Sequence, residues 1–226
     1  MLYYLDSART DLVAAALKKY PIDGITTNPT ILARDIEDGM TLSELLYELR
    51  KLTDGKKLFV QVTAEDVEGM VRDAEKIVSA LGGDITVKVP STPDGFEAIK
   101  VLKSSGISTA ATACYSTSQA LLTSKAGADF VAPYISHLDN LSLDGPGIAA
   151  EMARQLVYHN LDTQILAASF RTASQIERCI AGGVGAVTVT ADMLCILSSH
   201  PGTDKELSAF RQNWNMRFEK NISELL

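Results

Sequence analysis

The chain has 226 residues, of which 46% are hydrophobic and 22% are charged, and its formal net charge is −7. This apolar content suffices for one sizeable core, and a barrel of this length can form a single domain. The negative charge argues against a surface for nucleic acids or anionic membranes, although an acidic protein can still bind an anionic small molecule at a locally positive site.

The N-terminal sequence MLYYLDSART has neither the basic nor the apolar region of a signal peptide. No apolar run approaches the roughly 18 residues that a membrane-spanning helix needs. The three cysteines, Cys114, Cys179 and Cys195, show no CxxC spacing. We therefore interpret them as buried thiols and expect a protein of the reducing cytoplasm.

Short apolar segments recur along the chain, and each ends in small or polar residues. In chain order they are Tyr3–Asp6, Ile25–Asn28, Leu58–Thr63, Ile85–Pro90, Thr109–Cys114, Phe130–Ile135, Ile165–Phe170 and Ala186–Thr190. A helical pattern follows each segment, and capping-box spacings mark three helix starts, at Thr41 with Glu44, Ser116 with Gln119 and Thr172 with Gln175.

Strands that are apolar throughout are typical of a parallel sheet covered by helices. About eight strand–helix alternations without a break in composition favour a closed barrel over an open sheet. No glycine-rich dinucleotide-binding motif follows the first strand. The sequence thus predicts an α/β protein in which residues 1–226 form one (β/α)₈ TIM-barrel domain.

A further helix is predicted over about residues 203–225, after the last strand–helix unit. Leu207, Phe210, Trp214 and Phe218 form an apolar stripe along it. This stripe fits packing on the helix's own barrel and packing on a neighbouring subunit equally well.

Polar residues stand at the predicted strand ends, where barrels of this kind carry their chemistry. They are Asp6, Asn28, Gln61, Thr63, Lys88, Thr112, Tyr134, Ser169 and Arg171. Because a closed barrel brings all strand ends to one mouth, these side chains are expected to converge in an active site.

Lys88 is the residue that most clearly indicates chemistry. In the segment Ile85–Pro90, strand alternation places Lys88 on the face opposite Val87 and Val89. If the valines pack under the helices, Lys88 points into the barrel, where burial lowers the pKa of its amine and makes it a nucleophile for a carbonyl group. The alternative is a structural lysine paired with a carboxylate such as Asp6.

Other candidate residues have both a catalytic and a structural interpretation. Asp6 is the expected charge partner and proton carrier for Lys88, or the N-cap of the helix near Thr10. Asn28 could bind a substrate hydroxyl, or serve as a turn residue before Pro29. Gln61, Thr112 and Tyr134 could together hold one water molecule and pass protons through the tyrosine, although each alone fits a structural role.

An anion site is predicted after the seventh strand. Ser169 and Arg171 lie at a helix N-terminus, where a hydroxyl, a guanidinium and free backbone N–H groups can bind a phosphate. The alternative for Arg171 is a solvated surface charge. The histidines, His137, His159 and His200, show no metal-ligand spacing, so no metal site is predicted.

These motifs resemble the family of transaldolases and fructose-6-phosphate aldolases. The similarity runs from Tyr4–Asp6 to Trp214, through the motifs Gly24–Thr30, Val87–Pro90, Val131–Tyr134 and Ala167–Arg171. It implies that Lys88 is the Schiff-base lysine, Asp6 the aspartate of the first strand and Asn28 a substrate-binding residue, with Thr26 of the same motif a further candidate contact.

The resemblance also implies a cytoplasmic homo-oligomer, a pentamer or decamer whose C-terminal helix reaches a neighbour, without metal or organic cofactor. Gln61 and Tyr134 are similar to the aldolase subtype, since classical transaldolases usually carry glutamate and phenylalanine there. His137 occupies the place of an arginine that usually helps to hold the phosphate. We therefore count His137 among the candidate substrate-binding residues.

The expected function is a class I aldolase that cleaves a ketose such as fructose 6-phosphate into dihydroxyacetone and an aldehyde. Two alternatives remain open within and outside this class. One is a transaldolase, with a phosphorylated, sulfonated or neutral donor sugar. The other is a barrel that binds a sugar phosphate without turning it over.

Overall fold

The computed structural model describes residues 1–226. Eight parallel strands form a closed barrel in the order of the chain, β1-β2-β3-β4-β5-β6-β7-β8, with β8 paired to β1. The predicted α/β TIM barrel is therefore confirmed. The strands are β1 (Leu2–Asp6), β2 (Gly24–Thr26), β3 (Lys57–Gln61), β4 (Ile85–Pro90), β5 (Thr109–Cys114), β6 (Phe130–Pro133), β7 (Gln164–Ala167) and β8 (Ala186–Val189).

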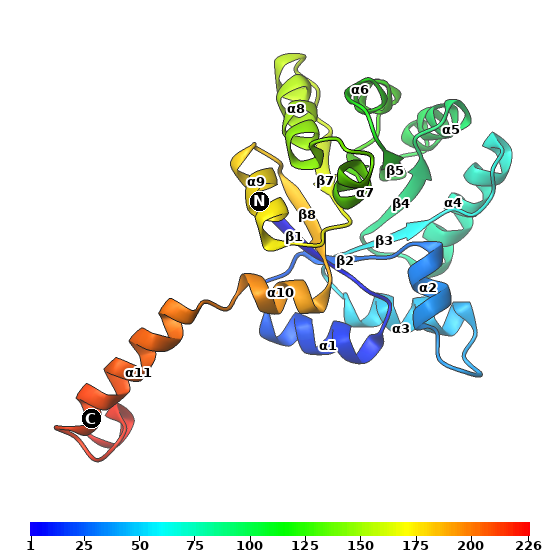
Figure 1. Cartoon of the computed structure of the whole chain (residues 1–226). Coiled ribbons are helices and arrows are strands. Elements are labelled where there is room, and N and C mark those ends of the chain that lie inside the picture. The colour runs from blue at the N-terminus through cyan, green and yellow to red at the C-terminus, as the bar shows by residue number, and fades with distance from the viewer. The chain divides into compact units, whose positions relative to one another are not determined.

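Helices surround these strands in the barrel unit, which comprises residues Met1–Ala191 (Figure 1). They are α1 (Thr10–Lys19), α2 (Pro29–Asp35), α3 (Leu42–Leu52), α4 (Val67–Leu81), α5 (Pro93–Ser104), α6 (Thr117–Ala126), α7 (Ile135–Asn140), α8 (Gly145–Tyr158) and α9 (Ala173–Ala181). Two of them, α2 and α7, are short helices between a strand and the longer helix that follows. They lie directly after strand ends and so contribute to the barrel mouth.

A second unit comprises Asp192–Leu226. Helix α10 (Ala191–Leu197) leads into it, and α11 (Pro201–Asn215) and a 3₁₀ turn (Ile222–Glu224) follow. The predicted last helix therefore ends about ten residues too late. Beyond Asn215 the chain folds back, because the Trp214 indole donates to the Lys220 carbonyl oxygen at 2.9 Å and its ring packs on Phe218. That one domain spans the whole chain stays a prediction.

No helix in this chain combines the length and the apolar character that spanning a bilayer would require. The cysteines divide into two groups: Cys114 and Cys179 are buried, as predicted, whereas Cys195 is exposed. The prediction for Cys195 was wrong because α10 shows Cys195 on the face opposite its buried residues, Met193 and Leu194.

The caps at the helix starts largely follow the sequence signals. Thr41 and Thr172 form complete capping boxes with Glu44 and Gln175. Ser116 caps α6 through the Gln119 N–H, but the Gln119 side chain accepts from the N–H of Tyr115 at 2.9 Å. The local signals thus place the helix starts correctly even where one reciprocal bond differs.

The barrel interior is filled by one apolar cluster below the mouth. Side chains from six strands meet there, and in the closed barrel only the interior brings these strands together. The aromatic rings pack edge to face, Tyr4 on Phe59 at 5.0 Å and Phe59 on Phe130 at 5.3 Å between centroids. Strand alternation then directs Asp6 and Gln61, two residues beyond Tyr4 and Phe59, inward at the mouth.

Candidate active site

The strand ends open into a cavity of about 600 Å³. This volume is typical of pockets for small molecules. The predicted site residues that line it are Asp6, Asn28, Gln61, Lys88, Tyr134, His137 and Ser169. The structure therefore brings together side chains that are up to 163 residues apart, from Asp6 to Ser169 (169 minus 6).

Lys88 lies on the cavity wall and is almost fully buried, with 5% of its surface exposed. Its ammonium nitrogen Nζ donates to the carbonyl oxygen of Thr27 at 2.9 Å. Burial lowers the pKa of this amine, and the nearby Asp6 carboxylate partly counteracts that shift. A larger share of the amine is therefore neutral, and hence nucleophilic, than for a lysine in water.

Asp6 is the acidic residue of the cavity, but it forms no direct ion pair with Lys88. Its Oδ1 accepts from the Thr26 hydroxyl at 2.7 Å, and that hydroxyl lies 2.6 Å from the Thr188 hydroxyl. Burial raises the pKa of Asp6, while Lys88 and Thr26 lower it. The raised pKa suits a carboxyl group that gives up and regains a proton during a reaction.

These contacts bear on the alternative role considered for Asp6 and on the candidate role of Thr26. Asp6 is not the N-cap of α1, because Arg9 occupies that position. Thr26 is buried and does not line the cavity, and its hydroxyl donates to Asp6.

Asn28 is both a structural residue before Pro29 and a lining residue of the cavity, the two roles between which the sequence left a choice. Its Oδ1 accepts from the Ile31 N–H at 2.9 Å and caps α2, and Pro29 is the first residue of that helix. The side chain also lines the cavity. Because the oxygen is used by the cap, the amide nitrogen remains to donate to a substrate oxygen.

Tyr134 and Thr112 form a direct hydrogen bond, with 2.8 Å between their hydroxyl oxygens. Burial raises the pKa of the Tyr134 phenol, so that its hydroxyl keeps its proton at neutral pH. Gln61 lines the cavity beside Lys88, its partner in the β3–β4 register. Thr112 itself is buried and reaches the cavity through Tyr134.

Ser169 and His137 follow strands β7 and β6, on the side of the barrel mouth opposite α2. Ser169 has a left-handed backbone (φ 61°), and its hydroxyl lies 2.8 Å from that of Ser136. The His137 ring is exposed, packs near Tyr134 at 5.3 Å between centroids and lies 3.3 Å from the Tyr115 hydroxyl through Nδ1. Both can donate hydrogen bonds to a ligand.

Arg171 and Thr63, both expected at the mouth, do not line this cavity. Strand β7 ends at Ala167, so the chain has already turned into the α9 cap where Arg171 stands. Its exposed guanidinium donates through Nη1 to Asn140 at 3.3 Å. Thr63 follows β3 by two residues and is bound through its N–H and hydroxyl to Asp73.

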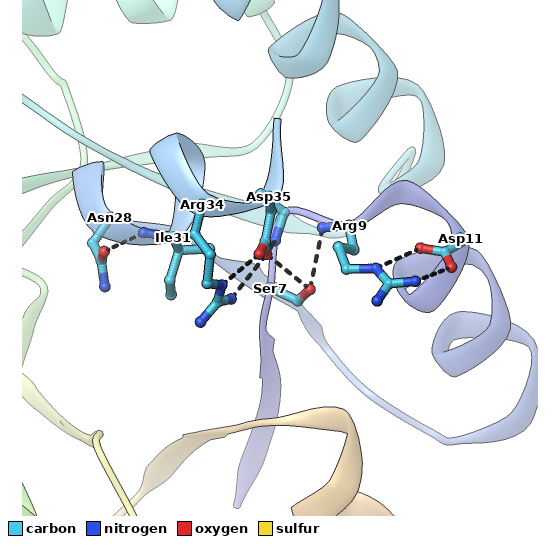
Figure 2. A network of polar contacts seen from close by, with 8 residues as sticks. Ser7, Arg9, Asp11, Asn28, Ile31, Arg34 and Asp35 are labelled. Atoms are coloured by element: carbon cyan, nitrogen blue, oxygen red, sulfur yellow. Dashed lines mark hydrogen bonds and ion pairs between the residues drawn. The ribbon is translucent and has the colours of Figure 1, made fainter. Parts of the chain in front are cut away.

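Arg34 also lines the cavity, although no sequence motif pointed to it. It belongs to α2, which the pattern did not resolve as a separate helix after the second strand. Figure 2 shows Arg34 beside Asp35, on the same side of α2 as Asn28 and Ile31. The spacing of three residues from Asn28 to Ile31 and from Ile31 to Arg34 is the available signal, because it places all three on one helix face.

Comparisons with known proteins show which family the chain resembles. Residues 3–226 match the family described as Transaldolase/Fructose-6-phosphate aldolase. The chain belongs to this family. It is 36% identical over 215 residues to a probable fructose-6-phosphate aldolase of Streptococcus pneumoniae, covering 95% of this chain and 96% of that protein. It is 37% identical over 210 residues to a probable transaldolase of Hyphomonas neptunium, covering 93% and 95%.

Among solved structures, the chain is similar to a thiamine phosphate pyrophosphorylase from Pyrococcus furiosus, with a TM-score of 0.58 and 18% identity over 84% of this chain and 85% of that one. A mandelate oxidase variant gives the same TM-score at 14% identity, covering 91% and 69%. At such identities the likeness concerns the barrel fold alone. Family membership supports an aldolase or transaldolase activity, as the sequence motifs indicated.

Proposed function

We propose that this protein is a Schiff-base (class I) aldolase that cleaves the C3–C4 bond of a ketose such as fructose 6-phosphate. The products are dihydroxyacetone and an aldehyde such as glyceraldehyde 3-phosphate. The observation that carries the proposal is the buried amine of Lys88 on the cavity wall, with a pKa below its ordinary value. We also expect the enzyme to work in the cytoplasm and to need no cofactor.

In the first half of the proposed reaction, the neutral Lys88 amine adds to the C2 carbonyl carbon. The carbonyl oxygen leaves as water after it has taken one proton from the amine nitrogen and one from an acid. Asp6 is the acid that fits this step, because its raised pKa allows it to hold a proton and its carboxylate then faces the positive iminium.

In the second half, the iminium accepts the electron pair of the C3–C4 bond and becomes an enamine. The proton of the C4 hydroxyl passes to water at the Thr112–Tyr134 pair, and the aldehyde leaves. Protonation of the enamine carbon and addition of water then release dihydroxyacetone and restore Lys88. The neutral Tyr134 phenol suits a relay that donates one proton as it receives another.

A transaldolase is the second candidate, since relatives of both names are equally similar to this chain. In that reaction an acceptor aldehyde captures the enamine before water does. The Tyr134 hydroxyl beside Thr112 favours hydrolysis, because a proton donor next to the enamine speeds its protonation. A binding protein without turnover is the third possibility, but binding alone does not require a desolvated amine.

Borohydride trapping tests the proposal. With dihydroxyacetone or a ketose phosphate, reduction should attach the carbon skeleton covalently to the protein, and intact mass and a peptide map should locate it on Lys88. Lys88→Ala should abolish the adduct, whereas Lys57→Ala, on the neighbouring strand β3 and paired with Asp84, should retain it. An adduct on another lysine would contradict the assignment of Lys88, and the absence of any adduct would contradict the Schiff-base mechanism.

A further inference from the structure

The cavity presents three cationic or potentially cationic side chains, those of Lys88, His137 and Arg34. Lys88 is committed to the carbonyl carbon in the proposed function, on which this inference rests. The His137 ring already lies within hydrogen-bonding distance of Tyr115. Arg34 is thus the only permanently charged side chain of the cavity wall without a part in the chemistry.

The guanidinium of Arg34 is held by its neighbour Asp35. Nε donates to Oδ1 at 2.6 Å and Nη2 donates to Oδ2 at 3.0 Å. These two bonds use one edge of the planar group and leave Nη1, with its two N–H groups, without a partner in the protein. A second bidentate contact, such as one to the oxygens of a phosphate or sulfonate, can form on that free edge.

Asp35 is itself fixed, so the guanidinium does not have to be ordered when a ligand binds. Only 3% of the Asp35 side chain is exposed, against 64% for Arg34. Its Oδ2 accepts from the Ala8 N–H at 3.0 Å and from the Ser7 hydroxyl at 3.5 Å, both in the loop after β1 (Figure 2). This loop follows Asp6 directly, which ties the orientation of Arg34 to the strand that carries the acid of the site.

We propose that Arg34, oriented by Asp35, binds the terminal phosphate or sulfonate of the sugar and determines the preference of this enzyme for anionic substrates. Asn28 and Ile31, which share its side of α2, also line the cavity (Figure 2). Arg171 is the competing candidate from the sequence, but its Nη1 is bound to Asn140 and its side chain does not line the cavity.

The chain offers a matched control in Arg9. Its guanidinium forms the same type of two-bond pair with a near neighbour, through Nε and Nη2 to Asp11 at 3.2 and 2.6 Å (Figure 2). Arg9 does not line the cavity. Replacing Arg9 therefore removes an equivalent surface ion pair and the same single positive charge, and it leaves the proposed anion site unchanged.

The test compares Arg34→Gln, Arg171→Gln and Arg9→Gln on fructose 6-phosphate, 6-deoxy-6-sulfofructose and fructose. Arg34→Gln should raise KM for both anionic ketoses about ten-fold and leave KM for fructose within about two-fold, since the site is exposed and already partly neutralised by Asp35. The other two variants should stay near the wild type. A loss confined to one anion would identify that anion as the ligand.

Equal losses on charged and neutral ketoses would overturn the proposal, and so would a selective loss in Arg171→Gln alone. Asp35→Asn should raise KM for the anionic ketoses by a smaller factor, with kcat and KM for fructose little changed. Arg34→Lys should lose less affinity than Arg34→Gln but more than the wild type, because an ammonium restores the charge but cannot form the two parallel hydrogen bonds of a guanidinium.

A separate readout distinguishes this inference from the proposed function. Trapping of dihydroxyacetone on Lys88 by borohydride needs no anion, so Arg34→Gln should be trapped as fully as the wild type, which also shows that the variant is folded. If the wild type is not trapped, but fructose 6-phosphate binding by calorimetry still weakens in Arg34→Gln, the aldolase mechanism fails and the anion site stands. If trapping succeeds and calorimetry shows no weakening, the anion site fails.

Discussion

At the scale of single residues, the proposed chemistry depends on one amine that water hardly reaches. Burial lowers the pKa of Lys88, and the Asp6 carboxylate raises it again. The two effects act on the same proton equilibrium in opposite directions. The pH at which the amine becomes nucleophilic is therefore set by the balance between desolvation and this single carboxylate.

Asp6→Asn should shift the pH profile of Schiff-base formation to lower pH. Without the carboxylate, the charged form of Lys88 is less stable, so the amine loses its proton more readily. The plateau of the trapping rate should fall at the same time, because the proton donor for the leaving water is gone. Initial rates of borohydride trapping with dihydroxyacetone between about pH 5 and 10 would measure both effects, in the range where lysines with lowered pKa titrate.

Asp11→Asn is the control for this profile, because Asp11 is exposed and paired with Arg9 outside the cavity. It should leave the profile of the wild type unchanged. An unshifted profile in Asp6→Asn would mean that Asp6 does not act on the lysine.

Tyr134→Phe should lower acceptor-free cleavage of a ketose phosphate and raise the fraction of turnover that ends in transfer. The phenol that protonates the enamine is lost, so the enamine survives longer for an aldehyde to capture. General acid–base groups typically contribute about 10²- to 10⁴-fold, so the drop in hydrolysis should be large. Product ratios with and without an added acceptor aldehyde measure it.

Tyr115→Phe gives the comparison for that variant. The Tyr115 ring lies near the Tyr134 ring, but its hydroxyl interacts with His137 and not with Thr112. If Tyr134→Phe and Tyr115→Phe changed the ratio of transfer to hydrolysis alike, the effect would not be specific to the Tyr134 hydroxyl. Wild-type turnover that strictly requires an acceptor would place the protein among the transaldolases.

At the scale of elements, the site depends on how closely helices follow the ends of strands. Helix α5 starts three residues after β4, capped by Thr92 with Pro93 in its first turn. Gly95 lies in that turn, and a Cβ atom there would collide with the Pro90 carbonyl oxygen. The absence of a side chain at Gly95 thus allows α5 to pack on the end of the strand that carries Lys88.

Gly95→Ala should destabilise the protein by about 1–3 kcal/mol, the usual effect of forcing a methyl group into a packed site. The displaced end of β4 should also slow borohydride trapping on Lys88. Urea unfolding and trapping rates would measure the two effects. Glu97→Ala, on the exposed face of the same helix, should change neither, and a Gly95→Ala protein of wild-type stability would show that the contact relaxes freely.

At the scale of the whole molecule, helix α11 of the second unit carries large apolar side chains. Within α11, Leu207 and Phe210 are 54% and 62% exposed and lie on one helix face. Large apolar surfaces of this kind are typical of contact sites. We propose that the protein is a homo-oligomer, which is consistent with the packing of this stripe on another subunit.

Leu207→Lys combined with Phe210→Lys should reduce the molar mass measured by light scattering toward that of one chain, 24.3 kDa. Charged side chains on the stripe would have to be desolvated in any contact it makes. Glu206→Lys, an exposed change on the same helix, should leave the mass of the assembly unchanged. A wild-type protein that is already monomeric would contradict the proposal.

The sequence by itself determined the features that depend on local pattern. The repeated alternation of apolar strands with amphipathic helices predicted the barrel. Strands β4 and β5 have the predicted bounds. Short polar signals placed the caps at Thr41, Ser116 and Thr172. Lys88 was chosen as the candidate nucleophile because a charged residue inside an apolar strand conflicts with its surroundings, and such a conflict is visible in sequence.

The tertiary structure decided which of the strand-end residues face one another. Arg34 and Arg171 are both arginines shortly after a strand, and only the path of the chain through α2 and the α9 cap brings one to the cavity and turns the other away. Thr26 was assigned to the substrate, but its side chain is buried between Asp6 and Thr188, residues far apart in the chain. Contacts between strands that are distant in the chain depend on closure of the barrel and on the register of strand pairing. Neither of these produces a local sequence pattern.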